Sequence, residues 1–326
     1  DAEVPPRLDG GPPDATVKDR PPPAAPISAR DGSWTYVEFP DTKCRDGSPA
    51  GVSVRLNSAS KKLLIYLEGG VYCFDALTCA INPANVNETL FNSAKTAPSV
   101  GIFDQNNREN PVRDWNLIYV PYCTGDAMGG TNTAPTDVPG GPTKQWFVGH
   151  LNFQKFLPRI VATFSTPSDV VLTGMSAGGS SVVMNVLLLQ RAYPWIKVRF
   201  INDSSWPPVS KALFPECLQK KLRTLWGLDQ SLLASCGASC PNRDDYWQDY
   251  NLFVAQTLHD RPSGFIDAIE DSMMRAVLGV GLRGCTGSLL FDSVGAAPFE
   301  AELLSFRDRL SPYAQFSTFY QSGTQH

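Results

Sequence analysis

The stretch that most constrains this chain lies at residues 170–180 and reads VVLTGMSAGGS. Its apolar, β-branched beginning is typical of a buried strand, and the mostly apolar residues 182–189 are compatible with a helix. Between them, Gly174-x-Ser176-x-Gly178 has the pattern of a sharp turn that presents a serine hydroxyl at the carboxyl end of a sheet. A glycine-rich loop can carry the same pattern by chance, but the flanking strand and helix favour Ser176 as a nucleophile.

The composition excludes several function classes. The chain has 326 residues, of which 42% are hydrophobic and 18% charged, so it can bury a large core. A net charge of −4 without a basic stripe argues against nucleic-acid binding. No run of apolar residues is long enough to span a membrane. The sequence starts without a charged and then apolar leader, so we expect any signal peptide to lie outside it.

The domain organisation follows from a change in composition near residue 30. Residues 1–30 are rich in proline, aspartate and alanine and predict a disordered tether. Such a tether suggests membrane or surface anchoring upstream of residue 1, and a tail without a role is the alternative. Residues 31–326 predict a single domain.

Strands and helices alternate along this domain. The runs typical of buried strands are residues 63–67, 117–120, 170–174 and 198–201. With helical patterns between them, such as residues 153–164, they predict an α/β fold: a mostly parallel central sheet with helices on both faces. Residues 205–262 indicate a helical insertion whose aromatic residues form either a substrate platform or, for most of them, the insertion's own core. Functional residues gather where parallel strands end, and such ends hold Glu68, Gly69, Gly70, Ser176 and Asp203.

Eight cysteines are more consistent with disulfides than with a metal site. The spacing of Cys236 and Cys240 permits a metal, but the chain has only three histidines and none is near them. We therefore expect no metal and an oxidising location: secreted, cell-surface or periplasmic. Cys73 and Cys79 are expected to close a small loop. The pairing of the others stays open: Cys44, Cys123, Cys217, Cys236, Cys240 and Cys285.

A serine nucleophile needs a base, and the three histidines make that search short. In a fold of this class the order along the chain is serine, acid, histidine. His150 precedes Ser176 and is interpreted as structural. His259 lies in an amphipathic helical segment, whereas His326 follows a strand-like run at residues 316–320 and a short polar loop. The pattern therefore favours His326.

The acid and the oxyanion hole are less well defined by pattern. The carboxylates that could orient the histidine are Asp203, Asp260, Asp267, Glu270 and Asp271, and spacing alone does not choose between them. An oxyanion hole needs backbone N–H groups. Ala177 supplies one, and the glycine-rich loop that includes Gly70 and Val71 is expected to supply the others.

Four segments of the chain resemble the pectin acetylesterase and Notum family. They are residues 66–74, 118–126, 174–179 and 202–206, which read YLEGGVYCF, IYVPYCTGD, GMSAGG and NDSSW. The similarity runs from about residue 40 to the carboxyl end. It implies an α/β-hydrolase-like fold and a secreted serine esterase without a cofactor.

The resemblance also assigns roles to single residues. Residues 269–274 match the family segment that holds the acid, which implies Asp271, with Asp267 as the fallback. It places His326 as the base. Substrate contacts are expected from Tyr72, Asp203 and Trp206.

The expected function is removal of short acyl groups, acetyl above all, from polysaccharide or related esters by a monomer. Val71 stands where the family has tryptophan, a residue that walls a deep acyl pocket in the animal member, so a more open site is expected here. The alternatives are a lipid or acyl-protein deacylase, a polyester hydrolase, and a non-catalytic carbohydrate-binding protein of the same fold. We also expect the native chain to continue past His326.

Overall fold

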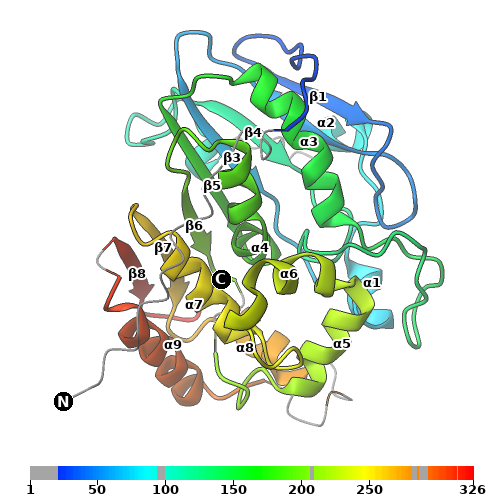
Figure 1. Cartoon of the computed structure of the whole chain (residues 1–326), viewed down its shortest axis with the longest axis vertical. Coiled ribbons are helices and arrows are strands. Elements are labelled where there is room, and N and C mark those ends of the chain that lie inside the picture. The colour runs from blue at the N-terminus through cyan, green and yellow to red at the C-terminus, as the bar shows by residue number, and fades with distance from the viewer. Residues whose placement is uncertain (1–20, 94–99, 206–208, 281–284, 286–292, 314) are drawn as a thin grey trace.

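The computed structural model describes residues 21–93, 100–205, 209–280, 285, 293–313 and 315–326. Its centre is an eight-stranded sheet in the order β1-β2-β4-β3-β5-β6-β7-β8 (Figure 1). The strands are β1 (Trp34–Phe39), β2 (Ala50–Arg55), β3 (Lys62–Leu67), β4 (Asn116–Val120), β5 (Asp169–Met175), β6 (Arg199–Asp203), β7 (Ser263–Ala268) and β8 (Phe316–Gln321). The two pairings β1–β2 and β2–β4 are antiparallel and the others are parallel, so the predicted mostly parallel sheet is confirmed.

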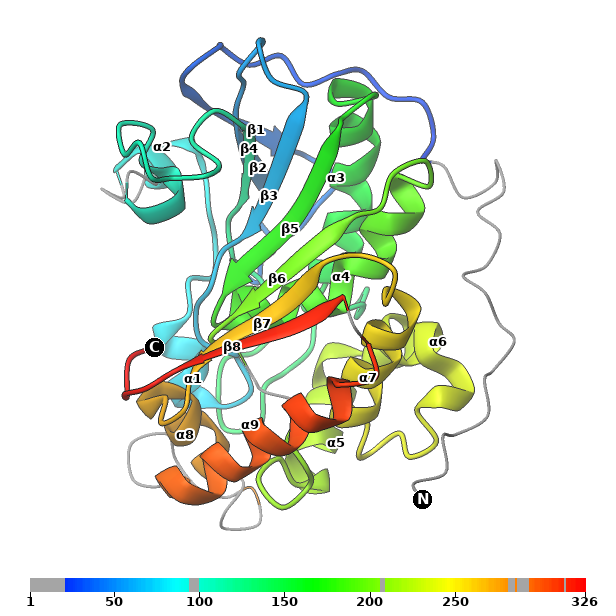
Figure 2. The same ribbon diagram turned by 90° about the vertical axis from the view of Figure 1, so that its left-hand side faces the viewer.

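The helices that follow these strands cover the sheet unevenly. They are α1 (Ala76–Ile81), α2 (Glu88–Ser93), α3 (Gly149–Thr163), α4 (Ala177–Ala192), α5 (Glu216–Trp226), α6 (Leu232–Cys236), α7 (Trp247–Thr257), α8 (Ser272–Gly279) and α9 (Ala296–Leu310). Helices α3 and α4 lie behind the sheet in Figure 2, and Phe306 of α9 packs edge-on against Phe265 of β7. On the other face, Phe91 of α2 packs with apolar residues of β3, β4 and β5. Farther along that face, Ile201 and Phe319 are 40% and 63% exposed.

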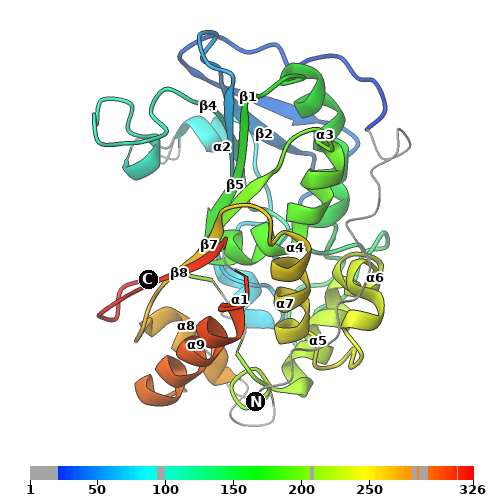
Figure 3. The ribbon, with the colours of Figure 1, turned by 60° about the vertical axis from the view of Figure 1, so that its left-hand side comes forward.

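The predicted helical insertion comprises α5, α6 and α7, which lie on the α4 side of the sheet (Figure 3). Its largest aromatic side chains are fully buried: Trp226, Tyr246, Trp247 and Tyr250. They are part of the main hydrophobic core of the domain. The indole N–H of Trp226, for example, donates to the carbonyl oxygen of Cys73 over 3.1 Å.

The predicted tether is wrong for its last residues. Ile27 is buried, and its N–H donates to the hydroxyl of Thr163 at the end of α3 over 2.7 Å. Arg159 of α3 donates to the carbonyl oxygens of Ala25 and Pro26. Apolar surface on α3 thus gives this proline-rich segment a place to pack that its composition alone does not reveal. Residues 1–20 lie outside the described part of the chain.

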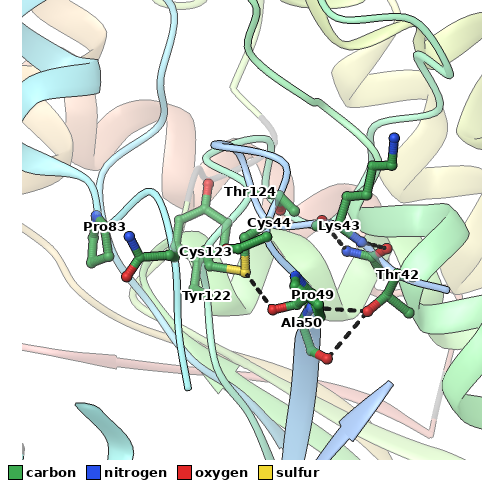
Figure 4. Close-up of a disulfide and its surroundings, with 12 residues drawn as sticks. Thr42, Lys43, Cys44, Pro49, Ala50, Pro83, Tyr122, Cys123 and Thr124 are labelled. Atoms are coloured by element: carbon green, nitrogen blue, oxygen red, sulfur yellow. Dashed lines mark hydrogen bonds between the residues drawn. A yellow bond between two sulfur atoms is a disulfide. The ribbon is translucent and has the colours of Figure 1, made fainter. Parts of the chain in front are cut away.

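All eight cysteines form disulfides. The expected Cys73–Cys79 bond is present, and the other pairs are Cys44–Cys123, Cys217–Cys285 and Cys236–Cys240. The Cys44–Cys123 bond joins the segment after β1 to the loop after β4 (Figure 4). Within the described residues, no group of three His, Cys, Asp or Glu side chains could hold a metal ion. Among those same residues, no helix has the length and apolar character to cross a membrane.

Candidate active site

Ser176 lies in the turn between β5 and α4 with a strained backbone. Its φ is 58° and its ψ −127°, a region that residues with a side chain seldom adopt. The N–H of Ser176 donates to the carbonyl oxygen of Asp203 over 2.9 Å, which ties this turn to the end of β6. A Cβ at Gly178 would overlap the carbonyl oxygen of Leu67, so the approach of α4 to β3 requires glycine there. Ser176 itself is 8% exposed.

The glycine-rich loop after β3 lies directly against this turn. A Cβ at Gly69 would overlap the carbonyl oxygen of Met175 and reach 3.2 Å from the Cβ of Ser176. A Cβ at Gly70 would lie 2.7 Å from the ring of Tyr122. Ala177 is the first residue of α4, and the first N–H groups of a helix have no acceptor within it. The predicted oxyanion donors therefore come from two segments that meet at Ser176.

Glu68 anchors this loop, a role that the sequence reasoning missed. Its Oε2 accepts from the N–H of Tyr122 over 2.7 Å, and the hydroxyl of Tyr119 donates to the same carboxylate. Burial raises the pKa of Glu68. The loop that carries Tyr122 is in turn held by the Cys44–Cys123 disulfide beside it (Figure 4). The sequence feature that could have indicated this role is a charged residue directly after a buried apolar strand.

Replacing Gly69 with alanine is expected to lower kcat/KM for a small ester by about 10²-fold, because the added methyl group displaces the loop from the nucleophile turn. Gly140→Ala is the control: a Cβ at this surface glycine would contact nothing within 4 Å, and its φ of 69° means that the substitution strains only the local backbone. Steady-state hydrolysis of nitrophenyl acetate by both variants measures the difference. Equal activity of the two variants would contradict the placement of the loop.

At the other end of the site, His326 and Asp271 form a close pair. The Nδ1 of His326 lies 2.8 Å from the Oδ2 of Asp271. The Asp271 side chain is 0% exposed and that of His326 is 19% exposed. The Oδ1 of Asp271 accepts from the N–H of Met274 and so caps α8. Both oxygens of the Asp271 carboxylate are thus engaged, one by the imidazole and one by the helix.

Backbone hydrogen bonds hold the last residues of the chain on the turn that carries Asp271. The N–H groups of residues 269, 270 and 272 donate to the carbonyl oxygens of residues 321, 323 and 324, over 2.9, 3.1 and 3.1 Å. The Ser272 hydroxyl adds a bond to the carbonyl of Thr324. His326 is therefore positioned by the same turn as its carboxylate partner.

Asp203 connects the two halves of the site. Its carbonyl oxygen accepts from Ser176, and its carboxylate accepts from the hydroxyl of Ser204 over 2.9 Å. Burial raises the pKa of Asp203, the nearby charge of Asp271 raises it further, and His326 lowers it. Asp203 thus lies next to the backbone of the serine and within electrostatic reach of the histidine.

The other histidines lie elsewhere. His150 is buried at the start of α3, where its Nδ1 pairs with the Oδ1 of Asn185 over 2.9 Å, as a structural role requires. Burial lowers the pKa of His150 to about 4. His259 is exposed, and its Nδ1 contacts the carbonyl oxygen of Gln256.

The predicted substrate contact of Tyr72 is wrong. Its side chain is 1% exposed, and its hydroxyl pairs with that of Ser180 in α4 over 2.7 Å, behind the loop. Val71, its neighbour, is half-buried. Trp206, the third expected contact, lies outside the described residues.

Comparisons with known proteins agree with this architecture. A profile of the pectinacetylesterase family matches residues 30–253. Palmitoleoyl-protein carboxylesterase notum1' of Xenopus laevis is 34% identical over 175 residues, which is 50% of this chain and 34% of that protein. Palmitoleoyl-protein carboxylesterase NOTUM of Drosophila melanogaster is 30% identical over 251 residues, 69% of this chain and 37% of that protein. The chain therefore spans about a third of the length of these curated relatives.

A solved structure shares the fold. The Wnt deacylase Notum from Drosophila superposes with a TM-score of 0.62 at 24% identity, covering 88% of this chain and 84% of that one. The α/β-hydrolase-like architecture is thereby confirmed. The family profile extends over more than half of the sequence. The chain therefore belongs to the pectinacetylesterase family, which is named after a carboxylic ester hydrolase.

Proposed function

We propose that the chain is a serine carboxylic ester hydrolase in which Ser176 is the nucleophile, His326 the base and Asp271 the acid. The single observation that carries this proposal is the contact of 2.8 Å between His326 and a fully buried Asp271, at the sheet edge where β5 presents Ser176. A serine hydroxyl becomes a strong nucleophile only when a base takes its proton and a carboxylate orients that base. The family name and the relatives named carboxylesterases support the same reaction class.

In the first step, the Ser176 oxygen attacks the ester carbonyl carbon while its proton passes to the free ring nitrogen of His326. The oxyanion accepts hydrogen bonds from the N–H groups of Gly70, Val71 and Ala177. The carbon–oxygen bond then breaks, and the alcohol leaves with the proton held by His326. In the second step, water loses a proton to His326 as it attacks the acyl carbon. The bond to the Ser176 oxygen then breaks, this oxygen takes the proton from His326, and the carboxylic acid leaves.

We propose short acyl groups, acetyl above all, on polysaccharide or related esters as the substrate. The family name supports an acetyl ester, and the small Val71, in the loop after β3, supports an open site. The second candidate is a lipid or acyl-protein deacylase, because curated relatives of the chain are named palmitoleoyl-protein carboxylesterases. A polyester hydrolase and a non-catalytic carbohydrate-binding protein are the remaining alternatives. Four disulfides support a secreted location in an oxidising compartment.

A series of nitrophenyl esters from acetate to palmitate separates these candidates. We expect kcat/KM to fall by about tenfold or more between acetate and octanoate, because a site without a deep acyl pocket gains nothing from added methylene groups. Ser176→Ala serves as the blank for spontaneous hydrolysis. Rising kcat/KM with chain length would contradict the acetyl assignment and favour the deacylase, and hydrolysis indistinguishable from the blank would favour the binding protein. Release of acetate from acetylated pectin and xylan then tests the alcohol partner.

A further inference from the structure

Two carboxyl groups meet beside the candidate base. Asp267 lies near the end of β7 and is 4% exposed, and Asp271 follows four residues later with a side chain that is 0% exposed. The two side chains are in hydrogen-bond contact. Two carboxylates have no proton to share and repel each other in a buried setting, so this contact requires one of the two groups to be protonated.

The proton belongs on Asp267. Asp271 acts as an acceptor on both oxygens, toward the N–H of Met274 and toward the imidazole of His326. Among the described residues, Asp267 accepts from the N–H of Ala268, over 2.8 Å, and its remaining polar contact is with Asp271.

The surroundings of Asp267 favour its neutral form. The groups that act on it are Asp271 at the start of α8 and Asp203 on β6, both of which are negative when ionised. Tyr320 on β8 is its neighbour in the sheet register, and Arg307 of α9 acts on that tyrosine. Burial together with the negative charge of Asp271 raises the pKa of Asp267 to about 9.

We propose that Asp267, as a neutral carboxylic acid, donates an O–H···O hydrogen bond to the carboxylate of Asp271 and so positions it for His326. The consequence for turnover rests on the function proposed above, whereas the hydrogen bond itself does not. Asp267 contacts neither the substrate nor the reacting atoms, so it is a positioning residue. Its proton stays in place throughout the reaction, and no bond to it forms or breaks.

This arrangement gives the buried Asp271 carboxylate three donors: the Met274 N–H, the Asp267 O–H and the His326 N–H. Three donors fix the plane of the carboxylate and stabilise its charge without a cation. When the pH rises above the pKa of Asp267, the proton leaves for solvent and the two carboxylates repel. Turnover is then expected to fall on the alkaline side because Asp271 no longer holds the imidazole in place.

Two substitutions test whether the Asp267 side chain acts as a hydrogen-bond donor or only fills space. Asp267→Asn keeps a donor that does not titrate, so kcat at pH 7 should stay within about threefold of the wild type, and the alkaline fall near pH 9 should disappear. Asp267→Leu keeps the approximate volume and loses the donor, so kcat should fall by about 10–100-fold with KM nearly unchanged. Asp114→Asn, on a side chain 76% exposed at the other end of the sheet, controls for the loss of one charge. Equal losses in the Asn and Leu variants, or an alkaline fall that persists unchanged in Asp267→Asn, would overturn the proposal.

A measurement of stability tests the same proton without any substrate. Because the folded-state pKa of Asp267 is raised from 3.8 to about 9, the stability it contributes is fully present below about pH 4 and is lost as pH rises toward 9. Asp267→Asn lacks this dependence. The urea midpoint of the variant minus that of the wild type should therefore rise steadily between pH 5 and pH 9, both of which lie in this window. If the difference between the two midpoints does not change with pH, Asp267 is not protonated and the proposal is wrong, even if the wild type hydrolyses esters. If the difference rises as expected but the protein has no esterase activity, Asp267 is protonated and only the proposed function is wrong.

Discussion

Replacing Ser176 with alanine is expected to lower kcat for nitrophenyl acetate by about 10⁶-fold. The loss is this large because the hydroxyl forms the covalent bond, and neither the oxyanion donors nor the His326–Asp271 pair can substitute for it. The fold should be unaffected, because the contacts that hold the turn are made by the backbone N–H of Ser176 and by the neighbouring glycines. Steady-state turnover at substrate saturation measures the effect.

Ser165 provides the matched control for this experiment. It is an exposed serine in the loop between α3 and β5, outside the site. Ser165→Ala should hydrolyse the ester at the wild-type rate. If Ser176→Ala kept more than about a hundredth of the wild-type rate, another residue would have to be the nucleophile.

Asp271→Asn is expected to lower kcat by about 10⁴-fold. The asparagine can still cap α8, since its carbonyl oxygen can accept from the N–H of Met274, so folding should be preserved. The amide, however, can donate a proton toward the Nδ1 of His326, which favours the wrong tautomer and weakens the base. Turnover of the same ester from pH 6 to pH 10, with circular dichroism as a check on folding, measures the loss.

The same measurement on Asp267 distinguishes which of the two carboxyl groups is the catalytic acid. The family resemblance implies Asp271 as the acid with Asp267 as the fallback, and the geometry joins His326 to Asp271. We expect a large loss for Asp271→Asn and a small one for Asp267→Asn. The reverse order would exchange the roles of the two carboxyl groups.

Much of the sheet could be predicted from sequence because its strands are continuous apolar runs. The four expected strands fall within two residues of β3, β4, β5 and β6. The short Cys73–Cys79 loop could be predicted for a similar reason, since six residues of separation leave those cysteines few other partners. The Cys44–Cys123 pair could not, because the two cysteines are 79 residues apart and meet only through the order of strands in the sheet.

In the candidate site, too, local features could be predicted from sequence and contacts between distant residues could not. Ser176 is set by a local turn, and a local pattern finds it. The choice of Asp271 depends on residues 321–324 folding back onto the turn at 269–272, a contact that spacing does not encode. Tyr72 was misplaced because its position next to Val71 in sequence does not fix the direction of its side chain, which points into the core toward Ser180.

Covalent labelling with a fluorophosphonate probe, followed by peptide mass mapping, tests the central claim most directly. We expect one phosphonyl group on the peptide that contains Ser176 in the wild type and in Ser165→Ala, no label in Ser176→Ala, and much slower labelling in Asp271→Asn. A label on a different residue, or ester hydrolysis that persists while Ser176 stays unlabelled, would contradict it.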